Sequence, residues 1–398
     1  MVCCTTMPYR CLAPLLVLAS TLAAVPARAA TVTALPLPEG YTVKPEGESR
    51  LISMAADHTV AAVASTEPSG RSRAVRWDAR GTRATFVPLP VLTAPGHGQY
   101  SKYDTKGIGG IAAGRGVVYV AATEMFSGAY SGLSFEAQRW IGSGTRRWTL
   151  PSCAAVDETD QHVNAVDADG RLALTMDMTG LGSHTVMQDE HGEYAPYAFI
   201  IDHTTCHDLG RAVVVGLRGR WAAGYRGYLN GHVAPTSLNV IVQRAVAVRW
   251  HDFVLSELGD GEAYAVNASG LAVGASAVAG RFDWQYTNFY GNPGREYRSA
   301  VPHARAWDPR GRTIAIETSA IRSVAYDVKD DGTVVGMLQA GDKRHFAFRW
   351  RAGRLERLDD LPHPAGWRFE SAYAIAADGT IAGIGTHNGI ATVFTWHE

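Results

Sequence analysis

One short segment constrains the fold of this chain more than any other feature, because degraded copies of it recur along most of the sequence. The segment reads AYAVNASGLAVG and runs from Ala263 to Gly274. Two clear copies follow it, AYDVKDDGTVVG from Ala325 to Gly336 and AYAIAADGTIAG from Ala372 to Gly383. Weaker copies precede it and begin at Met54, Ile111, Asn164 and Val214. A chain made of one repeated unit is expected to fold as a repeat architecture.

Each copy has the pattern of a β-hairpin. Small apolar residues alternate on both sides of a polar step that ends in glycine, which is typical of two short strands joined by a tight turn. The glycine supplies the positive φ of such a turn, and His58 stands in its place in the first copy. A third strand and a fourth strand-like piece follow each hairpin. The third strands end at Trp77, Trp140, Ile201, Trp250, Trp307, Trp350 and Trp396.

Four strands in a period of roughly 50 residues predict one propeller blade. The fold class is therefore all-β, and the repeats predict a single β-propeller of seven four-stranded blades with almost no helix. The last blade lacks its fourth strand, whereas the segment from Thr31 to Tyr41 resembles the fourth strand of the preceding blade. We predict that this N-terminal strand closes the ring. The blade tryptophans recur whatever the loop length, so we expect them to pack between neighbouring sheets.

The AxxxNxxGxxVG and HxAFxW motifs of the repeat resemble those of the HAF repeats, a family of bacterial extracellular proteins. The second motif survives in part at His345-Phe346-Ala347-Phe348 and at His303-Ala304-Arg305-Ala306. The resemblance covers most of the chain after the first 29 residues. It implies an exported β-protein built from repeats, and it implies no particular activity.

Residues 1–29 have the composition of a secretory signal peptide. Arg10 precedes an apolar run from Leu12 to Val25, and Ala27-Arg28-Ala29 ends the segment. We therefore assign the propeller to residues 30–398 and expect a secreted or periplasmic protein. No second apolar run is long enough to span a membrane. The 37 basic residues nearly balance the 38 acidic ones, so we expect no nucleic-acid partner.

Two of the five cysteines lie after the predicted signal peptide. These are Cys153 and Cys206, about one repeat apart. In an oxidising compartment they are expected to form a disulfide that ties the outer parts of two neighbouring blades. The alternative is a pair of buried free thiols.

The longest insertion points to a binding site. It runs from Val278 to Pro302, between the second and third strands of the fifth blade. Blades two to five are all enlarged at this position, so their insertions are expected to form a platform on one face of the ring. Aromatic rings stack on sugar faces while polar side chains pair with hydroxyls, although these rings could equally pack the core of their own loop. The predicted ligand-binding residues are Trp284, Tyr286, Tyr290, Asp283 and Arg295.

These features favour a monomeric module, without a cofactor, that binds an extended ligand, either a surface glycan or a cell-surface protein. The alternative is a secreted polysaccharide hydrolase or lyase that uses loop carboxylates. No spacing singles out a pair of them, so the catalytic residues stay unassigned. The candidates are Glu124, Glu136, Asp189, Glu190, Glu193, Asp283 and Glu296.

The sequence predicts no metal site. The histidines are scattered without the spacing of a zinc motif. The segment Asp167-Ala168-Asp169-Gly170 is similar to the start of a calcium loop, but it lacks the closing glutamate and coincides with the hairpin turn of its repeat. We interpret it as a turn.

Overall fold

The structure is a computed structural model of the chain. It describes residues 30–43, 52–66, 72–81, 83–87, 103–114, 117–127, 135–143, 146–147, 160–177, 197–202, 205–229, 232–234, 244–277, 283–287, 293–297, 302–317 and 319–398. In these ranges the only helical element is one 3₁₀ turn, η1 (Leu358–Asp360). None of the described segments forms a helix that could cross a membrane. The predicted signal peptide, residues 1–29, lies outside the described residues.

The described strands form seven sheets of four or five strands, which we number I to VII, and one separate two-stranded sheet. Sheet I contains β2 (Tyr41–Thr42), β3 (Ile52–Met54), β4 (Val60–Thr66), β5 (Ser72–Trp77) and β6 (Ala84–Phe86). Sheet II contains β7 (Tyr103–Gly114), β8 (Val117–Ser127), β9 (Phe135–Ser143) and β10 (Arg146–Arg147). Sheet III contains β11 (Asp160–Val166), β12 (Leu172–Asp177), β13 (Tyr197–Asp202) and β14 (Thr205–Arg211).

The remaining sheets come from the second half of the chain. Sheet IV contains β15 (Val213–Arg218), β16 (Trp221–Leu229), β17 (His232–Ala234), β18 (Arg244–His251) and β19 (Val254–Asp260). Sheet V contains β20 (Glu262–Val266), β21 (Ala272–Ala277), β24 (Pro302–Trp307) and β25 (Thr313–Ala315). Sheet VI contains β26 (Arg322–Val328), β27 (Val334–Gln339), β28 (His345–Arg351) and β29 (Arg354–Arg357). Sheet VII contains β30 (Trp367–Ile375), β31 (Ile381–His387), β32 (Ile390–His397) and β1 (Thr31–Leu35).

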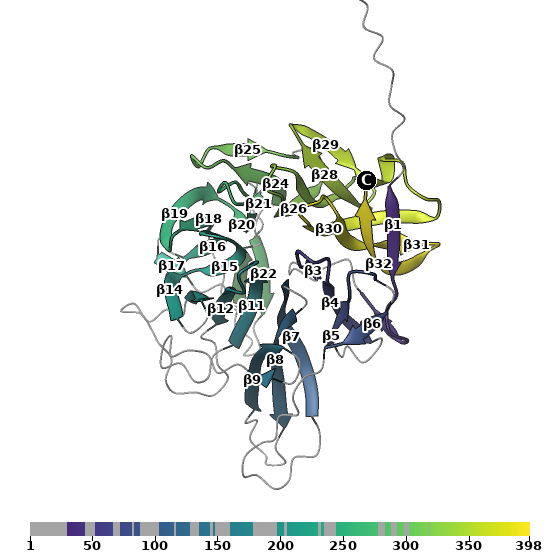
Figure 1. Ribbon diagram of the computed structural model, residues 1–398. Helices are drawn as coiled ribbons and strands as arrows, with labels where there is room; N and C mark the ends of the chain where they lie inside the picture. Colours follow the sequence, from purple (N-terminus) through teal and green to yellow (C-terminus); the bar gives the residue numbers. More distant parts are fainter. Residues whose placement is uncertain are drawn as a thin grey trace, which may run out of the picture.

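The sheets are arranged radially around a common centre (Figure 1). The inner strands are β3, β7, β11, β15, β20, β26 and β30, and each contacts the inner strands of both neighbouring sheets, so that they form a closed ring. The paired strands within each sheet are antiparallel, which permits short hairpin connections. The single all-β propeller predicted from the repeats is therefore confirmed.

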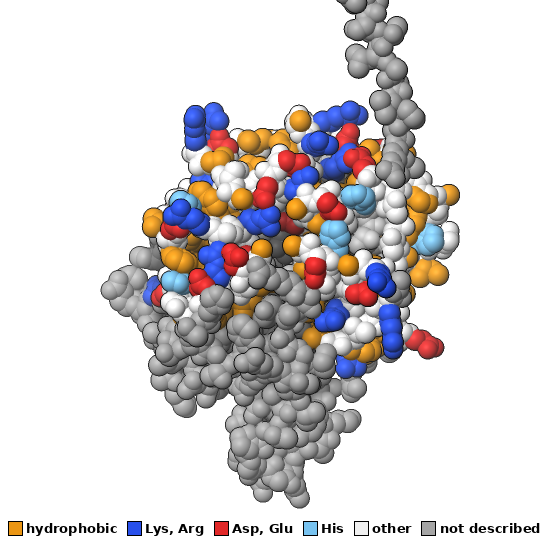
Figure 2. Space-filling model, in the orientation of Figure 1, with side chains coloured by type: hydrophobic (Ala, Val, Ile, Leu, Met, Phe, Trp, Pro, Cys, Tyr) orange, Lys and Arg blue, Asp and Glu red, His pale blue; other side chains and the backbone are white. Residues whose placement is uncertain are grey.

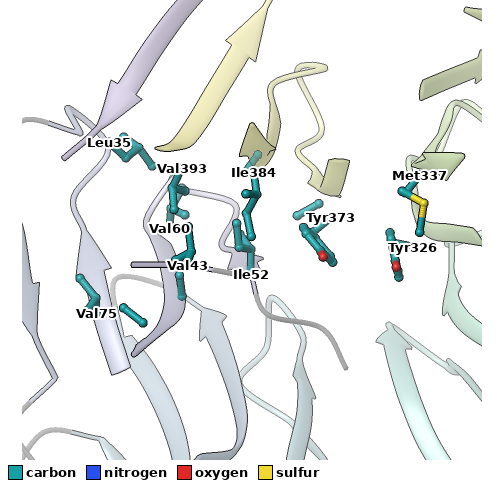
Figure 3. Packing of buried hydrophobic residues seen from close by; sticks show 14 of the residues in the cluster. Leu35, Val43, Ile52, Val60, Val75, Tyr326, Met337, Tyr373, Ile384 and Val393 are labelled. Atoms are coloured by element: carbon teal, nitrogen blue, oxygen red, sulfur yellow. The ribbon is translucent and has the colours of Figure 1, made fainter. Parts of the chain in front are cut away.

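The N-terminal strand closes the ring, as predicted. β1 pairs with β32 in antiparallel register, with Thr31 opposite His397 and Leu35 opposite Val393. Leu35 is buried in one cluster with Val60 and Val75 of sheet I and with Ile384 and Val393 of sheet VII (Figure 3). The first segment of the described chain thus completes the sheet that the last segment begins.

A β-bulge recurs at one place in five of the inner strands. The register shifts there by one residue, at Asn164, Val215, Tyr264, Tyr326 and Tyr373. In four of these sheets the residue before the bulge pairs with a glycine of the second strand, namely Gly224, Gly274, Gly336 and Gly383. A Cβ atom added at Gly336 would lie 2.0 Å from the carbonyl oxygen of Val324. The last glycine of the repeat is therefore required by the close approach of two backbones.

The other glycine of the repeat serves the hairpin turn. Gly270, Gly332 and Gly379 have φ of 84°, 85° and 93°. His58 occupies the same position with φ of 63°, and its Nε2 lies 3.3 Å from a carboxylate oxygen of Asp378 in sheet VII. The ion pair offers one compensation for a side chain in the left-handed region.

The blade tryptophans hold neighbouring sheets together. Trp77, Trp250, Trp307 and Trp396 are almost completely buried, and each packs in a cluster that includes the preceding sheet. Trp350 is only partly buried at the edge of a cluster between sheets V and VI, and the side chain of Trp140 lies outside the described part. The predicted packing role is confirmed for the four buried rings.

The arginine that precedes tryptophan reaches the following sheet instead. The Arg249 guanidinium donates to the carbonyl oxygens of Asp308 and Pro309 at 3.0 and 2.9 Å. Arg349 pairs with Glu398 at 3.0 Å and lies over the ring of Trp396. Alternation of side chains along a strand thus lets Arg-Trp contact both neighbouring sheets.

We predict that Trp307→Ala lowers the free energy of unfolding by about 3–5 kcal/mol, because it leaves a cavity between sheets IV and V. Trp350→Ala is the matched control and should cost less, because its ring is already partly exposed. Chemical denaturation of both variants measures the difference. Equal losses would contradict the assigned packing.

Deletion of residues 30–35 should lower the melting temperature and promote association, because it leaves the outer edge of β32 unpaired. The control is the chain that starts at residue 30. Thermal unfolding and size-exclusion chromatography compare the two, and identical melting and elution would show that closure by β1 is dispensable.

Candidate ligand-binding site

The insertion of sheet V contains a β-hairpin of its own. β22 (Asp283–Thr287) and β23 (Pro293–Tyr297) pair as the separate two-stranded sheet. Trp284 lies opposite Glu296 and Tyr286 opposite Gly294. The sequence analysis treated this segment as a loop. The alternation in FDWQYT, followed by Gly-Asn-Pro-Gly, was the signal that could have identified the hairpin.

The register divides the predicted binding residues into two groups. Trp284 and Tyr286 are two positions apart and therefore belong to one face of the hairpin. Asp283 belongs to the other face, together with Arg295, which lies opposite Gln285. Tyr290 lies outside the described residues. The two aromatic positions thus share one face of the hairpin, and the positions of the two charged residues belong to the other face.

Three candidate carboxylates, Asp189, Glu190 and Glu193, lie outside the described residues. Of the others, Glu124 and Glu136 belong to the paired strands β8 and β9, where Glu124 lies opposite Gln138 and Glu136 opposite Phe126. Asp283 and Glu296 belong to the paired strands β22 and β23, on opposite faces of the hairpin. Within the described part of the chain, no group of three or more His, Cys, Asp and Glu side chains is arranged to hold a metal ion.

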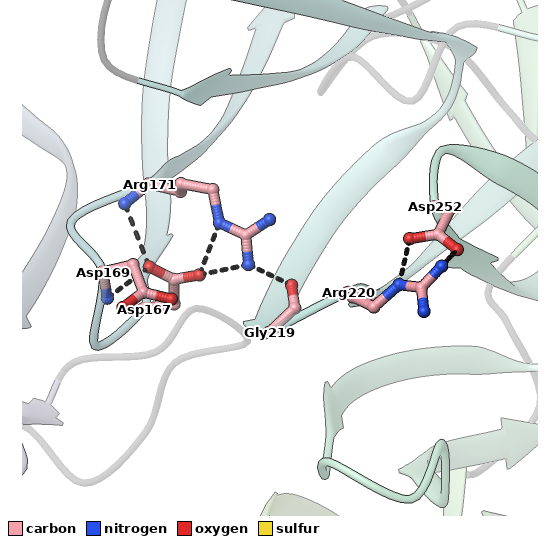
Figure 4. A network of polar contacts seen from close by, with 6 residues as sticks. All are labelled: Asp167, Asp169, Arg171, Gly219, Arg220 and Asp252. Carbon is pink, nitrogen blue, oxygen red and sulfur yellow. Dashed lines mark hydrogen bonds and ion pairs between the residues drawn. The ribbon is translucent and has the colours of Figure 1, made fainter.

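The calcium-like segment is a turn, as interpreted from the sequence (Figure 4). One carboxylate oxygen of Asp167 accepts hydrogen bonds from the backbone of Asp169 at 2.9 Å and of Arg171 at 3.0 Å. The other accepts from Arg171 Nε at 2.8 Å, and the same guanidinium donates to the carbonyl of Gly219 in sheet IV. The Asp167 carboxylate therefore fixes its own turn and orients an arginine toward the next sheet.

The other acidic side chains of the hairpin turns are engaged in the same way. Arg218 pairs with Asp330 at 2.6 Å, and Lys329 pairs with Asp331 at 2.8 Å. Burial alone would raise the pKa of Asp331, but hydrogen bonds from Lys329 and Thr333 lower this pKa to about 2. A general acid or base at neutral pH needs a pKa near that pH, so these ionised carboxylates are structural.

Acidic and basic side chains are mixed over the visible described surface (Figure 2). No single-sign patch dominates this view. The surface therefore offers no continuous track for a polyanion on this side.

Three tyrosines form a row near the centre of the ring. Tyr264, Tyr326 and Tyr373 occupy the bulge positions of three consecutive inner strands, and neighbouring ring centroids are 6.3 and 4.7 Å apart. Tyr326 and Tyr373 project into the same part of the core (Figure 3). The sequence analysis missed this row, although the shared Ala-Tyr at the start of three repeats was its signal.

Two tyrosines of the row, Tyr264 and Tyr373, have raised pKa values. Burial, together with the adjacent Glu262 carboxylate, raises the pKa of Tyr264 well above its usual range, and the Tyr264 hydroxyl donates to that carboxylate. Burial raises the pKa of Tyr373 to about 12. A nucleophilic tyrosine needs a lowered pKa or an adjacent base that removes its proton, so the raised pKa values favour a hydrogen-bonding and packing role for these phenols.

Of the two cysteines in the predicted mature chain, Cys206 lies in β14 and its sulfur is disulfide-bonded. Cys153 lies outside the described residues. The pairing of Cys153 with Cys206 therefore stays a prediction.

No protein-family model matches the chain, and no curated protein matches it either. The resemblance to the HAF repeats thus stays a prediction. The chain is similar to the β-propeller domain of the Trilobed protease from Pyrococcus furiosus, with a TM-score of 0.43, 9% identity and coverage of 85% of this chain and 100% of that chain.

Two further solved structures resemble it to a similar degree. Oligogalacturonate lyase from Vibrio parahaemolyticus gives a TM-score of 0.41 and 10% identity, with coverage of 92% of this chain and 93% of that chain. Trypanosoma rangeli sialidase in complex with the inhibitor DANA gives a TM-score of 0.41 and 9% identity, with coverage of 93% of this chain and 60% of that chain. We derive no function from similarities at this level.

The raised pKa of Tyr373 predicts a loss of stability at alkaline pH. The Tyr373 phenol ionises near pH 10 in the unfolded chain and near pH 12 in the folded protein. Ionisation of this group therefore leaves the free energy of unfolding unchanged below about pH 10 and lowers it as the pH rises toward 12. Unfolding midpoints measured across this window should fall more steeply for the native chain than for Tyr373→Phe. Parallel curves would contradict the assignment.

Proposed function

We propose that this protein is an exported β-propeller that binds an extended glycan through the face of hairpin β22–β23 that includes Trp284 and Tyr286. The observation that carries the proposal is the register of the hairpin. It gives two large aromatic residues alternate positions on one strand, about 7 Å apart along the chain. Successive aromatic rings with this spacing suit a linear polymer, because sugar rings stack on aromatic faces.

Binding explains the described polar groups better than catalysis does. The turn carboxylates with lowered pKa are already ion-paired, and the tyrosine pKa values are raised. Neither group supplies the near-neutral acid and base that glycoside cleavage uses. Polysaccharide hydrolysis or elimination remains the alternative, and it would depend on carboxylates of the long insertions.

Export is part of the same proposal. The predicted signal peptide supports a secreted or periplasmic protein. A disulfide at Cys206 fits an oxidising compartment, and Cys153 is its proposed partner.

The double variant Trp284→Ala/Tyr286→Ala should weaken binding of the strongest ligand on a glycan array by more than tenfold, because two stacking contacts of about 1 kcal/mol each are lost. The melting temperature should change by about 2 °C or less, because the hairpin lies outside the seven sheets. Isothermal titration calorimetry with that oligosaccharide measures the loss.

The matched control is Asp283→Ala/Gln285→Ala, which alters the same strand on its other face and should retain binding. Equal binding by both double variants would refute the hairpin as the contact surface. A reducing-end assay on the same ligand tests the alternative, and turnover by the native chain would favour an enzyme.

A further inference from the structure

The turn between β18 and β19 has an unusual backbone. It consists of Asp252 and Phe253, whose φ angles are 49° and 67°. A two-residue hairpin turn with both φ angles positive favours Asn-Gly or Asp-Gly, because bulky residues are disfavoured in the left-handed region. The corresponding turn of sheet VI is Ala352-Gly353, with glycine where sheet IV has phenylalanine.

Phe253 is held at the surface and not in the core. Its side chain is 38% exposed, and the next residue, Val254, is 69% exposed. The ring stacks in parallel on His207 of sheet III, with centroids 3.9 Å apart and planes 9° apart. An aromatic residue kept exposed in a disfavoured conformation points to a use for its ring.

Polar and aromatic groups surround this ring. His251 stacks on Trp221 with centroids 4.1 Å apart, and the Asp252 carboxylate forms a bidentate pair with Arg220 (Figure 4). We call His207, Trp221, His251, Phe253 and the Arg220–Asp252 pair the turn patch. The charges of Arg220 and Asp252 cancel. Hydrogen-bond donors and acceptors remain on the guanidinium, on the carboxylate and on the two imidazoles.

The turn patch of sheet IV and the insertion of sheet V that holds hairpin β22–β23 lie at opposite ends of their sheets. Connections along an antiparallel sheet alternate between its two ends. The β18–β19 turn joins a third strand to a fourth, whereas the β21–β24 insertion joins a second strand to a third. The turn patch therefore belongs to the face of the hairpin turns.

We propose that the turn patch is a second carbohydrate-binding site that stacks a neutral sugar ring on Phe253. Its ligand class is that of the proposed function, but the site is separate from the hairpin. The Arg220–Asp252 pair carries no net charge, so it does not attract a polyanion. Among the described residues of this turn, the exposed large apolar side chains are Phe253 and the adjoining Val254, less than a stable protein interface needs. An aromatic face bordered by donors and acceptors suits a sugar.

The decisive variant is Phe253→Gly, which installs the residue that this turn prefers. It should reduce the number of oligosaccharides bound per chain from two to one in calorimetry, while the melting temperature stays constant or rises. The probe is the neutral oligosaccharide that binds most strongly on the array. Ala352→Gly is the matched control, because it relieves a positive φ of 50° in the corresponding turn of sheet VI without touching an aromatic ring. The variant Phe253→Trp retains an aromatic ring and should still bind two oligosaccharides per chain.

Other outcomes overturn the inference. If Phe253→Gly still binds two oligosaccharides, or melts several degrees lower, the ring is not a binding residue. If Trp284→Ala/Tyr286→Ala abolishes all binding, the hairpin is the sole site, and the proposed function survives while this inference fails. If that double variant binds normally and Phe253→Gly does not bind, the turn patch stands and the proposed function fails. If no neutral oligosaccharide binds the native chain, the turn patch is not a sugar site.

Discussion

The close approach of two backbones beside the inner-strand bulges of four sheets is the constraint on which this propeller depends. At Gly274, Gly336 and Gly383 the carbonyl oxygen of the first strand lies 1.9 to 2.1 Å from where a Cβ atom would be. The extra residue bends and twists the inner strand. The same bend recurs in five of the seven described inner strands, and in three consecutive sheets it turns a tyrosine toward its neighbours.

This constraint explains why so much of the fold could be predicted from the repeat. The turn glycine, the bulge glycine and the buried tryptophan each satisfy a local steric requirement. Each requirement fixes a residue type, so it can be recognised in the sequence of the repeat. His58 shows the same logic, because it keeps the positive φ of the glycine it replaces. Closure by β1 was predictable too, since a missing fourth strand in the last repeat needed a strand from elsewhere.

The candidate site was less predictable, because it depends on register and on contacts between distant strands. Composition alone grouped Asp283 and Arg295 with Trp284, and only the pairing of β22 with β23 separates them. The tyrosine row depends on which residue becomes the bulge, and three repeats with Ala-Tyr do not reveal that their rings meet. The left-handed conformation of Phe253 is likewise seen only in its φ angle of 67°.

The bulge carbonyl leaves no room for a side chain at the last glycine of the repeat. The most direct test is the free energy of unfolding of Gly336→Ala, measured by denaturant titration against Gly341→Ala. A Cβ atom at Gly336 meets backbone and the Phe348 ring, whereas one at Gly341 in the same sheet meets nothing within 4 Å. We expect Gly336→Ala to lose about 3 kcal/mol or more and Gly341→Ala to stay within about 1 kcal/mol of the native value. Equal stability of the two variants would contradict the claim.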